Sequence, residues 1–389
     1  MIMKFNGYRR PDGRVGIRNH IVVMPGVLCS AVAARQIVNK VGDATFLYNP
    51  NGCAQCHKDT LTTLEILSGM IANGNVYGAL IVGLGCETTQ KNDYIKAIQA
   101  KTNKPLYYIS MQEEGGVQKT VEAGVKIVET MKQEAAKCVR EEVDIAELIL
   151  GLECGGSDPT SGFSANTVLG HTCDRIIDLG GSAVISETSE AIGAEHILKA
   201  RGRTADIGQR IYDTIVQWEE DRYKETGEDV RTNNPAPGNK AGGLTTLSEK
   251  SLGCIHKAGT RPFDGVYGYG EMIDKKGLFF MDTCAYDVAS VTAEVAGGAQ
   301  IVAFTTGRGT PTGNPIAPVV KITGNHETFV RLNDMTDFDT SASITGAKPF
   351  EQLGEELLHY IISVCNGETV KAEEIDASDV SINQNYSLV

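Results

Sequence analysis

The sequence of 389 residues contains no long apolar run, and no cluster of basic side chains outweighs its excess of acidic ones. Its longest apolar stretches, residues 21–34 and 78–85, are interrupted by Pro or Gly and fall short of the ~20 residues that a membrane-spanning helix needs. Lys and Arg number 36 against 49 Asp and Glu, which argues against a nucleic-acid or anionic-membrane surface. The first ten residues lack the apolar core of a signal peptide. We therefore expect a cytoplasmic protein with no nucleic-acid or membrane partner.

Glycine is abundant instead, with 43 residues and no short period, and 41% of the chain is hydrophobic. These values exclude collagen-like and disordered chains. Short apolar runs alternate with amphipathic helical patterns along the chain. Strands are expected at 20–27, 44–48, 78–85 and 105–110, and helices at 30–41, 60–72 and 93–101. This order predicts an α/β protein of two Rossmann-like domains, with mostly parallel sheets flanked by helices.

A highly charged segment at the end of a predicted helix over 117–143 marks the domain boundary. We place an N-terminal α/β domain at residues 1–139 and a C-terminal α/β domain at 140–389. Further strands are expected at 148–152, 182–186, 277–282, 301–306 and 319–323. The polar, Pro- and Gly-containing segment 226–243 is predicted to be a long loop, and such loops tend to be functional.

Three cysteines, Cys53, Cys86 and Cys154, lie in turns at the ends of predicted strands. Because ligands bind beyond the carboxyl ends of parallel strands, these thiols could converge on one metal site. Thiolates select iron, iron–sulfur clusters or zinc. Cys56 and His57 offer further ligands, whereas a redox pair of Cys53 with Cys56, or inert turn thiols, are the alternatives.

Several basic residues could bind an anionic substrate. The arginine-rich segment 7–20 holds Arg14, Arg18 and Asn19, and it is either an anion-recognition loop or a solvated hairpin with surface ion pairs. Asn239 and Lys240 lie in the loop 234–243, where the lysine could neutralise a carboxylate.

Other strand ends carry groups suited to anion binding and proton transfer. Arg308 follows a strand in a Gly-rich turn whose exposed amides form an anion cradle. Glu187 lies at a strand end, which suits a general base. Ser157 and Asp158 could bind a substrate hydroxyl or carry protons.

Together these segments resemble the altronate/galactarate dehydratase family, which comprises sugar-acid hydro-lyases, over roughly residues 6–367. The resemblance is closest at 7–19, 83–86, 154–158, 161–166, 234–244 and 304–313. It implies that residues 1–139 are the second domain of the family and that 140–389 are its C-terminal domain. It also implies metal-dependent β-elimination that converts an acid such as altronate or galactarate to a 2-keto-3-deoxy acid.

The resemblance extends to cofactor, partner and site residues. Iron is implied, as Fe²⁺ or an iron–sulfur cluster, or else Mn²⁺ or another divalent cation, and the three strand-end cysteines match cysteines of the family motifs. Glu187, Asp158 and His57 are the catalytic candidates. The small β-rich SAF-type domain of some members is absent here, so a separate small subunit is expected, in a hetero-oligomer or homo-oligomer that acts on a small hydroxy acid.

Two alternatives accompany this interpretation. A related protein is the large subunit of sulfolactate sulfo-lyase, which eliminates sulfite rather than water. A non-catalytic metabolite-binding subunit is the other alternative. The family usually has His at the position of Asn49, and His57 is the candidate replacement for that side chain.

Overall fold

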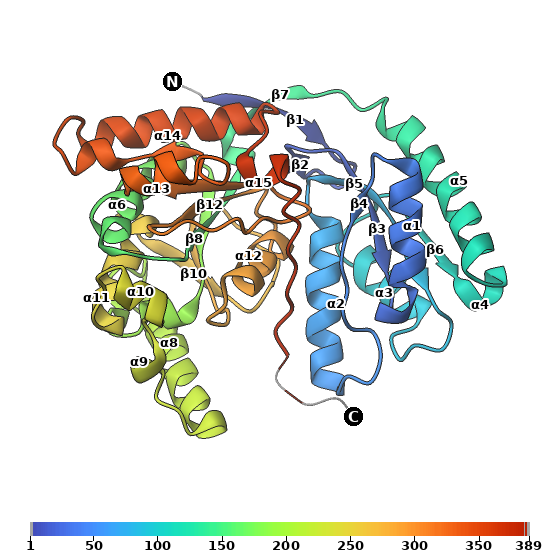
Figure 1. Ribbon diagram of the computed structural model, residues 1–389, viewed down its shortest axis with the longest axis horizontal. Coiled ribbons are helices and arrows are strands. Elements are labelled where there is room, and N and C mark those ends of the chain that lie inside the picture. The colour runs from blue at the N-terminus through green and yellow to red at the C-terminus, as the bar shows by residue number, and fades with distance from the viewer. Residues whose placement is uncertain (1–2, 385, 387–389) are drawn as a thin grey trace.

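The computed structural model describes residues 3–384 and 386, which form two parallel sheets side by side (Figure 1). The smaller sheet has the strand order β4-β3-β5-β6 and is parallel throughout. Its strands are β3 (His20–Pro25), β4 (Thr45–Phe46), β5 (Val76–Gly83) and β6 (Leu106–Ser110). Its helices are α1 (Ala31–Val41), α2 (His57–Ala72), α3 (Lys91–Gln99), α4 (Met111–Glu114) and α5 (Val117–Ala135). The apolar side chains of α1 and α5 pack on one face of this sheet, as the sequence pattern predicts.

The larger sheet has seven parallel strands in the order β10-β11-β9-β8-β12-β13-β14. Its strands are β8 (Ile149–Cys154), β9 (Ser182–Ile185), β10 (Phe263–Tyr267), β11 (Leu278–Met281), β12 (Ile301–Thr305), β13 (Val319–Thr323) and β14 (Phe338–Asp339). The helices around it are α6 (Asn166–Asp178), α7 (Glu195–Ala200), α8 (Ala205–Thr226), α9 (Val230–Asn233), α10 (Pro237–Ala241), α11 (Leu247–Cys254), α12 (Asp287–Ala296), α13 (His326–Arg331), α14 (Phe350–Cys365) and α15 (Lys371–Glu374). The α/β fold class with helix-flanked parallel sheets is thus confirmed.

The two sheets share a buried apolar core, in which α2 of the smaller unit packs against α12 of the larger unit (Figure 1). Gly69 of α2 lies against the backbone of Ala296 at the end of α12, where an added Cβ would come within 2.4 Å of the Ala296 carbonyl oxygen. The absence of a side chain at Gly69 therefore permits the close approach of the two helices.

A small antiparallel sheet joins the chain start to the segment between the two units. Its strands are β2 (Val15–Gly16), β1 (Lys4–Arg9) and β7 (Glu141–Asp144). The predicted helix over 117–143 was therefore too long, because pairing with β1 draws residues 141–144 into a strand. The predicted division at 139/140 stays a prediction.

The predicted loop 226–243 contains two short helices, α9 and α10, and so is more ordered than its composition indicates. Within residues 3–384 and 386, no helix has the length and apolar character needed to span a membrane.

Candidate active site

Four neighbouring strands of the larger sheet, β11, β9, β8 and β12, end at the same edge because they are parallel. The turns that follow them, together with α8–α11, enclose a cavity of about 680 Å³. The polar side chains that line it include Glu187, Asn239, Lys250, Asp287 and Arg308. This edge is the usual place for a ligand in a parallel sheet.

A cluster of three carboxylates forms one side of this site. Glu153 of β8, Glu187 after β9 and Asp287 at the start of α12 each place one oxygen within 4.8 Å of the others. The backbone of Glu187 is left-handed, with φ of 61°, and its amide donates to Thr283 Oγ1 at 2.6 Å. A Cβ on Gly155 would come within 1.9 Å of Asp287 Oδ2, so glycine makes room for that carboxylate. Strained backbone of this kind is retained mainly at functional sites.

None of the three carboxylates of this cluster forms an ion pair with a described residue. Burial raises the pKa of Glu153 to about 7, although Lys257 opposes the shift. Burial and the charges of Glu190 and Glu153 raise the pKa of Glu187 well above its ordinary value, and burial also raises that of Asp287. No donor among the described residues reaches Glu153 Oε1 or Glu187 Oε2. The cluster is therefore an acidic site that a bound cation would stabilise.

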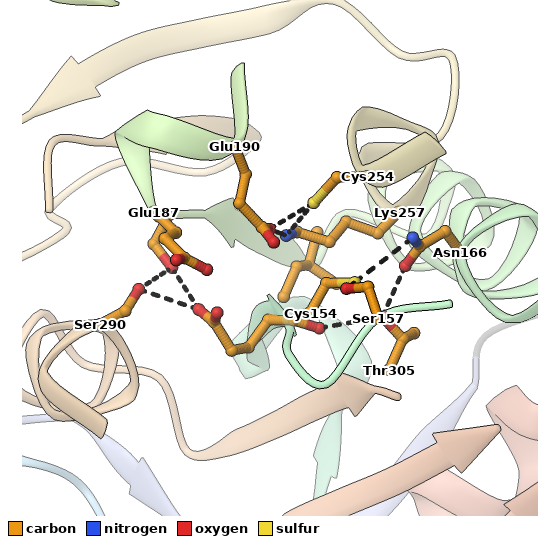
Figure 2. Close-up of polar contacts among 12 residues, drawn as sticks. Cys154, Ser157, Asn166, Glu187, Glu190, Cys254, Lys257, Ser290 and Thr305 are labelled. Atoms are coloured by element: carbon orange, nitrogen blue, oxygen red, sulfur yellow. Dashed lines mark hydrogen bonds and ion pairs between the residues drawn. The ribbon is translucent and has the colours of Figure 1, made fainter. Parts of the chain in front are cut away.

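A second cluster combines sulfur and oxygen. Cys154, Cys254 and Glu190 each place one ligand atom within 4.8 Å of the others (Figure 2). Lys257 Nζ lies 2.8 Å from both Glu190 Oε2 and Cys254 Sγ, and Lys250 Nζ lies 3.2 Å from Glu190 Oε1. Unlike the carboxylate cluster, this one is neutralised by two ammonium groups.

These contacts set the charges of the sulfur cluster. A hydrogen bond with Cys254 lowers the pKa of Cys154 to about 6, which favours its thiolate form. Burial raises the pKa of Cys254, which stays a thiol. Burial alone would raise the pKa of Glu190, but the charges of Lys257 and Lys250 outweigh it and lower that pKa.

Cys154 borders a smaller cavity of about 270 Å³. Its Sγ lies 3.2 Å from Ser157 Oγ and receives a weak hydrogen bond from Asn166 Nδ2 at 3.6 Å (Figure 2). Asn166 is itself held by Thr305, whose hydroxyl donates to Asn166 Oδ1 at 2.6 Å. Lys250 lines both cavities, so its ammonium lies between them.

Comparison with family models identifies both parts of the chain. Residues 7–136 match the second domain of D-galactarate dehydratase/altronate hydrolase, and residues 145–388 match the C-terminal domain of D-galactarate/altronate dehydratase. The chain belongs to the D-galactarate/altronate dehydratase family. This confirms the resemblance inferred from the motifs, and with it the expectation that the protein is a lyase.

Curated relatives support the family assignment. Altronate dehydratase of Bacillus subtilis is 36% identical over 97% of this chain and 77% of its own length. The (2R)-sulfolactate sulfo-lyase subunit beta of Chromohalobacter salexigens is 34% identical over 98% of this chain and 97% of its own length. Galactarate dehydratase (L-threo-forming) of Escherichia coli is 32% identical over 94% of this chain and 73% of its own length.

In this dehydratase-family protein, three residues proposed from the sequence line the same cavity. They are Glu187, Asn239 and Arg308. Asn239 Nδ2 also donates to the carbonyl oxygen of Ser157 at 2.9 Å, which ties α10 to the turn after β8. Lys240, next to Asn239, is exposed and is not among the residues that line the cavity.

Asp158 supports the turn after β8. Its Oδ1 accepts from the amides of Thr160 at 2.8 Å and Ser161 at 3.2 Å, and its Oδ2 accepts from Asn325 Nδ2 at 3.1 Å. The side chain borders the smaller cavity rather than the larger one. The structure thus gives Asp158 a supporting role at this turn.

The three predicted metal-binding cysteines do not come together. Cys53 and Cys86 are exposed in turns of the smaller unit, whereas Cys154 is buried in the larger one. Among the described residues, neither Cys53 nor Cys86 belongs to a group of three possible metal ligands. Cys53 and Cys86 follow β4 and β5 of the smaller sheet, whereas Cys154 ends β8 of the larger sheet, so the three cysteines do not share one sheet edge.

The arginine-rich segment makes contacts within the protein. Arg14 pairs with Asp12 at 2.7 Å, and Arg18 forms a two-pronged ion pair with Glu373 at 2.7 and 2.8 Å. Asn19 accepts from the Arg10 guanidinium at 2.7 Å and donates to the backbone of Ala135 at 3.0 Å. None of the three predicted residues, Arg14, Arg18 or Asn19, lines the 680 Å³ cavity.

Asn49, which occupies the position where the family usually has His, makes structural contacts in this protein. Asn49 is fully buried, donates to the carbonyl oxygens of Pro25 and Gly26 at 3.1 and 3.2 Å, and accepts from the amide of Asn51 at 3.0 Å. It therefore fixes a turn of the smaller unit. His57 is exposed at the first position of α2 and lines neither cavity, and its role as the replacement for that histidine stays a prediction.

Several site residues were not proposed from the sequence. Lys250 and Lys257 lie in helical patterns that resemble ordinary surface helices, and only the fold shows that they are buried beside Glu190. Glu153 was also not proposed, although the sequence carries a signal for it. It is a single charge inside an otherwise apolar strand. A charge in that position is rare without a functional or pairing reason.

Proposed function

We propose that the protein eliminates water from a sugar acid such as altronate or galactarate and yields a 2-keto-3-deoxy acid. The observation that carries this proposal is one cavity in which the acids Glu187 and Asp287 accompany the cations Lys250 and Arg308. Elimination beside a carboxylate needs a group that holds the carboxylate, a base for the neighbouring C–H and an acid for the leaving hydroxyl. The dehydratase names of three relatives support the same reaction class.

Each of these tasks has a candidate residue. The Arg308 guanidinium is exposed and has no ion-pair partner among the described residues, so it is free to hold the substrate carboxylate with two parallel hydrogen bonds. Glu187, which lines the cavity, takes in its carboxylate form the proton from the carbon next to the substrate carboxylate. Lys250 Nζ gives a proton to the hydroxyl on the following carbon, which leaves as water. The resulting enol then tautomerises to the 2-keto acid.

Lys250 is protonated, as this role requires. Burial alone would lower its pKa, but the charges of Glu190 and Glu187 outweigh burial and raise it. The proton is thus available at neutral pH, and it lies beside the cavity.

The donor set of the carboxylate cluster fits a divalent cation, which the resemblance implies. Glu153 Oε1 is buried without a donor, and Asp287 lines the cavity, so these two carboxylates would hold the ion beside Glu187. Oxygen ligands suit Mn²⁺ or Fe²⁺ better than an iron–sulfur cluster, which needs thiolates. When bound, the cation would polarise substrate oxygens and stabilise the negative charge that develops during proton removal.

We also propose that the active enzyme contains a separate small subunit of SAF type. The chain matches 77%, 76% and 73% of the lengths of the three dehydratase relatives, but 97% of a relative whose name describes it as subunit beta. The name of that relative describes one component of an enzyme with more than one subunit, which supports the proposal of a partner subunit.

The same relative supports a second candidate function, the release of sulfite from sulfolactate. The proposed roles of Arg308 and Glu187 would be unchanged, because sulfite departs from the carbon next to the one that loses its proton. The leaving group is therefore what separates the two functions.

The experiment is an assay of the metal-loaded protein, purified anaerobically together with its small partner. Formation of a 2-keto acid from altronate or galactarate is the expected result, and sulfite release from sulfolactate would support the second candidate. Tight binding of these acids without turnover would instead indicate a metabolite-binding subunit and contradict both.

A further inference from the structure

Glu294 is a buried acid for which the proposed reaction has no use. It lies on α12, is fully buried, and forms no ion pair with any described residue. Its Oε1 accepts from the amide of Leu152 at 3.1 Å and lies 2.8 Å from Ser186 Oγ. Its Oε2 has no hydrogen-bond partner in the part of the chain that the structure describes, and it lies beside Gly151. A buried acid is costly compared with an apolar residue of the same size, so its contacts call for an explanation.

Two serine hydroxyls connect Glu294 to Glu153. Ser186 Oγ lies 2.8 Å from Glu294 Oε1 and 3.0 Å from Glu153 Oε2. Ser290 Oγ lies 2.9 Å from the same Glu153 oxygen and 2.7 Å from Ser186 Oγ (Figure 2). Both serines therefore lie at Oε2 of Glu153, which leaves Oε1 as the oxygen without a donor.

The number of protons that these four side chains share decides which group donates in each hydrogen bond. Each serine hydroxyl has one proton to donate. If Glu294 carries a proton on Oε1 and donates it to Ser186, then Ser186 can direct its own proton to Glu153. Burial raises the pKa of Glu294 well above its ordinary value, which agrees with a protonated side chain.

We propose that Glu294 is a positioning residue that acts through Ser186 and Ser290 to hold the Glu153 carboxylate with Oε1 directed toward the cation position. The proposal rests on the proposed function, because it requires a cation beside Glu153 and Asp287. Residues that orient a metal ligand through hydrogen bonds commonly change metal affinity by about tenfold or more when they are replaced.

Glu294→Gln tests this role with little change in shape. A glutamine oxygen at the place of Oε1 still accepts from Leu152 and Ser186, but it has no proton to donate. It therefore draws the Ser186 proton away from Glu153. We expect the dissociation constant for Mn²⁺, measured on the whole protein by electron paramagnetic resonance, to rise about tenfold or more.

Two further variants make the test specific. Thr292→Val alters a buried polar residue two positions away on the same helix, and it should leave Mn²⁺ affinity unchanged. Ser186→Ala removes the connecting hydroxyl, so it should weaken Mn²⁺ binding by itself and remove most of the additional effect of Glu294→Gln.

The outcomes separate this inference from the proposed function. Two results would overturn the role of Glu294 while the cation site still stands. One is an unchanged Mn²⁺ affinity in folded Glu294→Gln. The other is that Glu294→Gln weakens Mn²⁺ binding as much in the Ser186→Ala variant as in the parent protein. If the parent protein binds no Mn²⁺, the cation site itself is wrong and this inference fails with it.

Discussion

The ammonium of Lys257 donates to the carboxylate of Glu190 at 2.8 Å, and neither side chain is more than 2% exposed. Lys257→Met leaves Lys250 as the one ammonium that faces the buried Glu190, so we expect the free energy of unfolding to fall by about 3 kcal/mol. Urea unfolding followed by circular dichroism measures the loss. The exposed pair of Lys224 with Glu220 gives the control, since Lys224→Met should have no measurable effect. Similar results for both variants would contradict this view of the sulfur cluster.

Arg308 should determine how tightly the substrate is held. We expect Arg308→Lys to raise KM about tenfold with a smaller change in kcat, because a point charge does not replace a two-pronged guanidinium. Steady-state kinetics of 2-keto acid formation measure both constants. Lys240→Ala is the control, since Lys240 is exposed outside the cavity and its loss should leave KM unchanged. An unchanged KM in Arg308→Lys would remove Arg308 from the substrate site.

The exposed thiols of the smaller unit should be dispensable for cation binding. We expect the double variant Cys53→Ser, Cys86→Ser to bind one equivalent of Mn²⁺ with the affinity of the parent protein, because neither thiol joins a ligand group in the described chain. Asp287→Asn should bind Mn²⁺ more weakly under the same conditions. Metal loss in the cysteine variant would restore the thiolate site that the sequence predicted.

His20 should make the protein sensitive to acid. Burial lowers the pKa of His20 to about 4, and its Nδ1 lies 3.1 Å from Thr45 Oγ1. Between pH 6.5 and 4 the unfolded chain binds a proton that the folded protein excludes, so stability falls as the pH falls. The gap between 6.5 and about 4 corresponds to about 3 kcal/mol.

The matching variant is His20→Asn, which keeps an acceptor near Thr45 and cannot titrate. Unfolding measured at pH 7 and pH 4.5 should show a smaller loss on acidification for the variant than for the parent. Equal losses would show that other groups cause the acid sensitivity.

The sequence predicted those parts of the fold that local patterns control. The apolar run at 78–85 predicts a buried parallel strand, and β5 occupies Val76–Gly83. The edge strands β10 and β14 were missed because Phe263–Tyr267 carries a charge and a glycine and Phe338–Asp339 is only two residues long. Edge strands depend on a neighbour for their pairing, and a single sequence does not show that neighbour.

The site was predictable to a similar extent. Glu187 and Arg308 were found because each follows an apolar strand, and parallel strands gather their carboxyl ends at one edge. The same argument does not tell which sheet a strand joins, so it did not predict that Cys154 lies on a different sheet from Cys53 and Cys86. Lys257 was beyond local reasoning, since only tertiary packing distinguishes a buried lysine from a solvated one on a similar helix.

The central claim is that a cation lies at the carboxylate cluster of the larger sheet, beside the base Glu187. The most direct measurement is anomalous diffraction from a crystal of the protein soaked in Mn²⁺. The account predicts a strong anomalous peak within ligand distance of Glu153 and Asp287. A peak at Cys53 and Cys86, or between Cys154 and Cys254, with none at the carboxylates would contradict it.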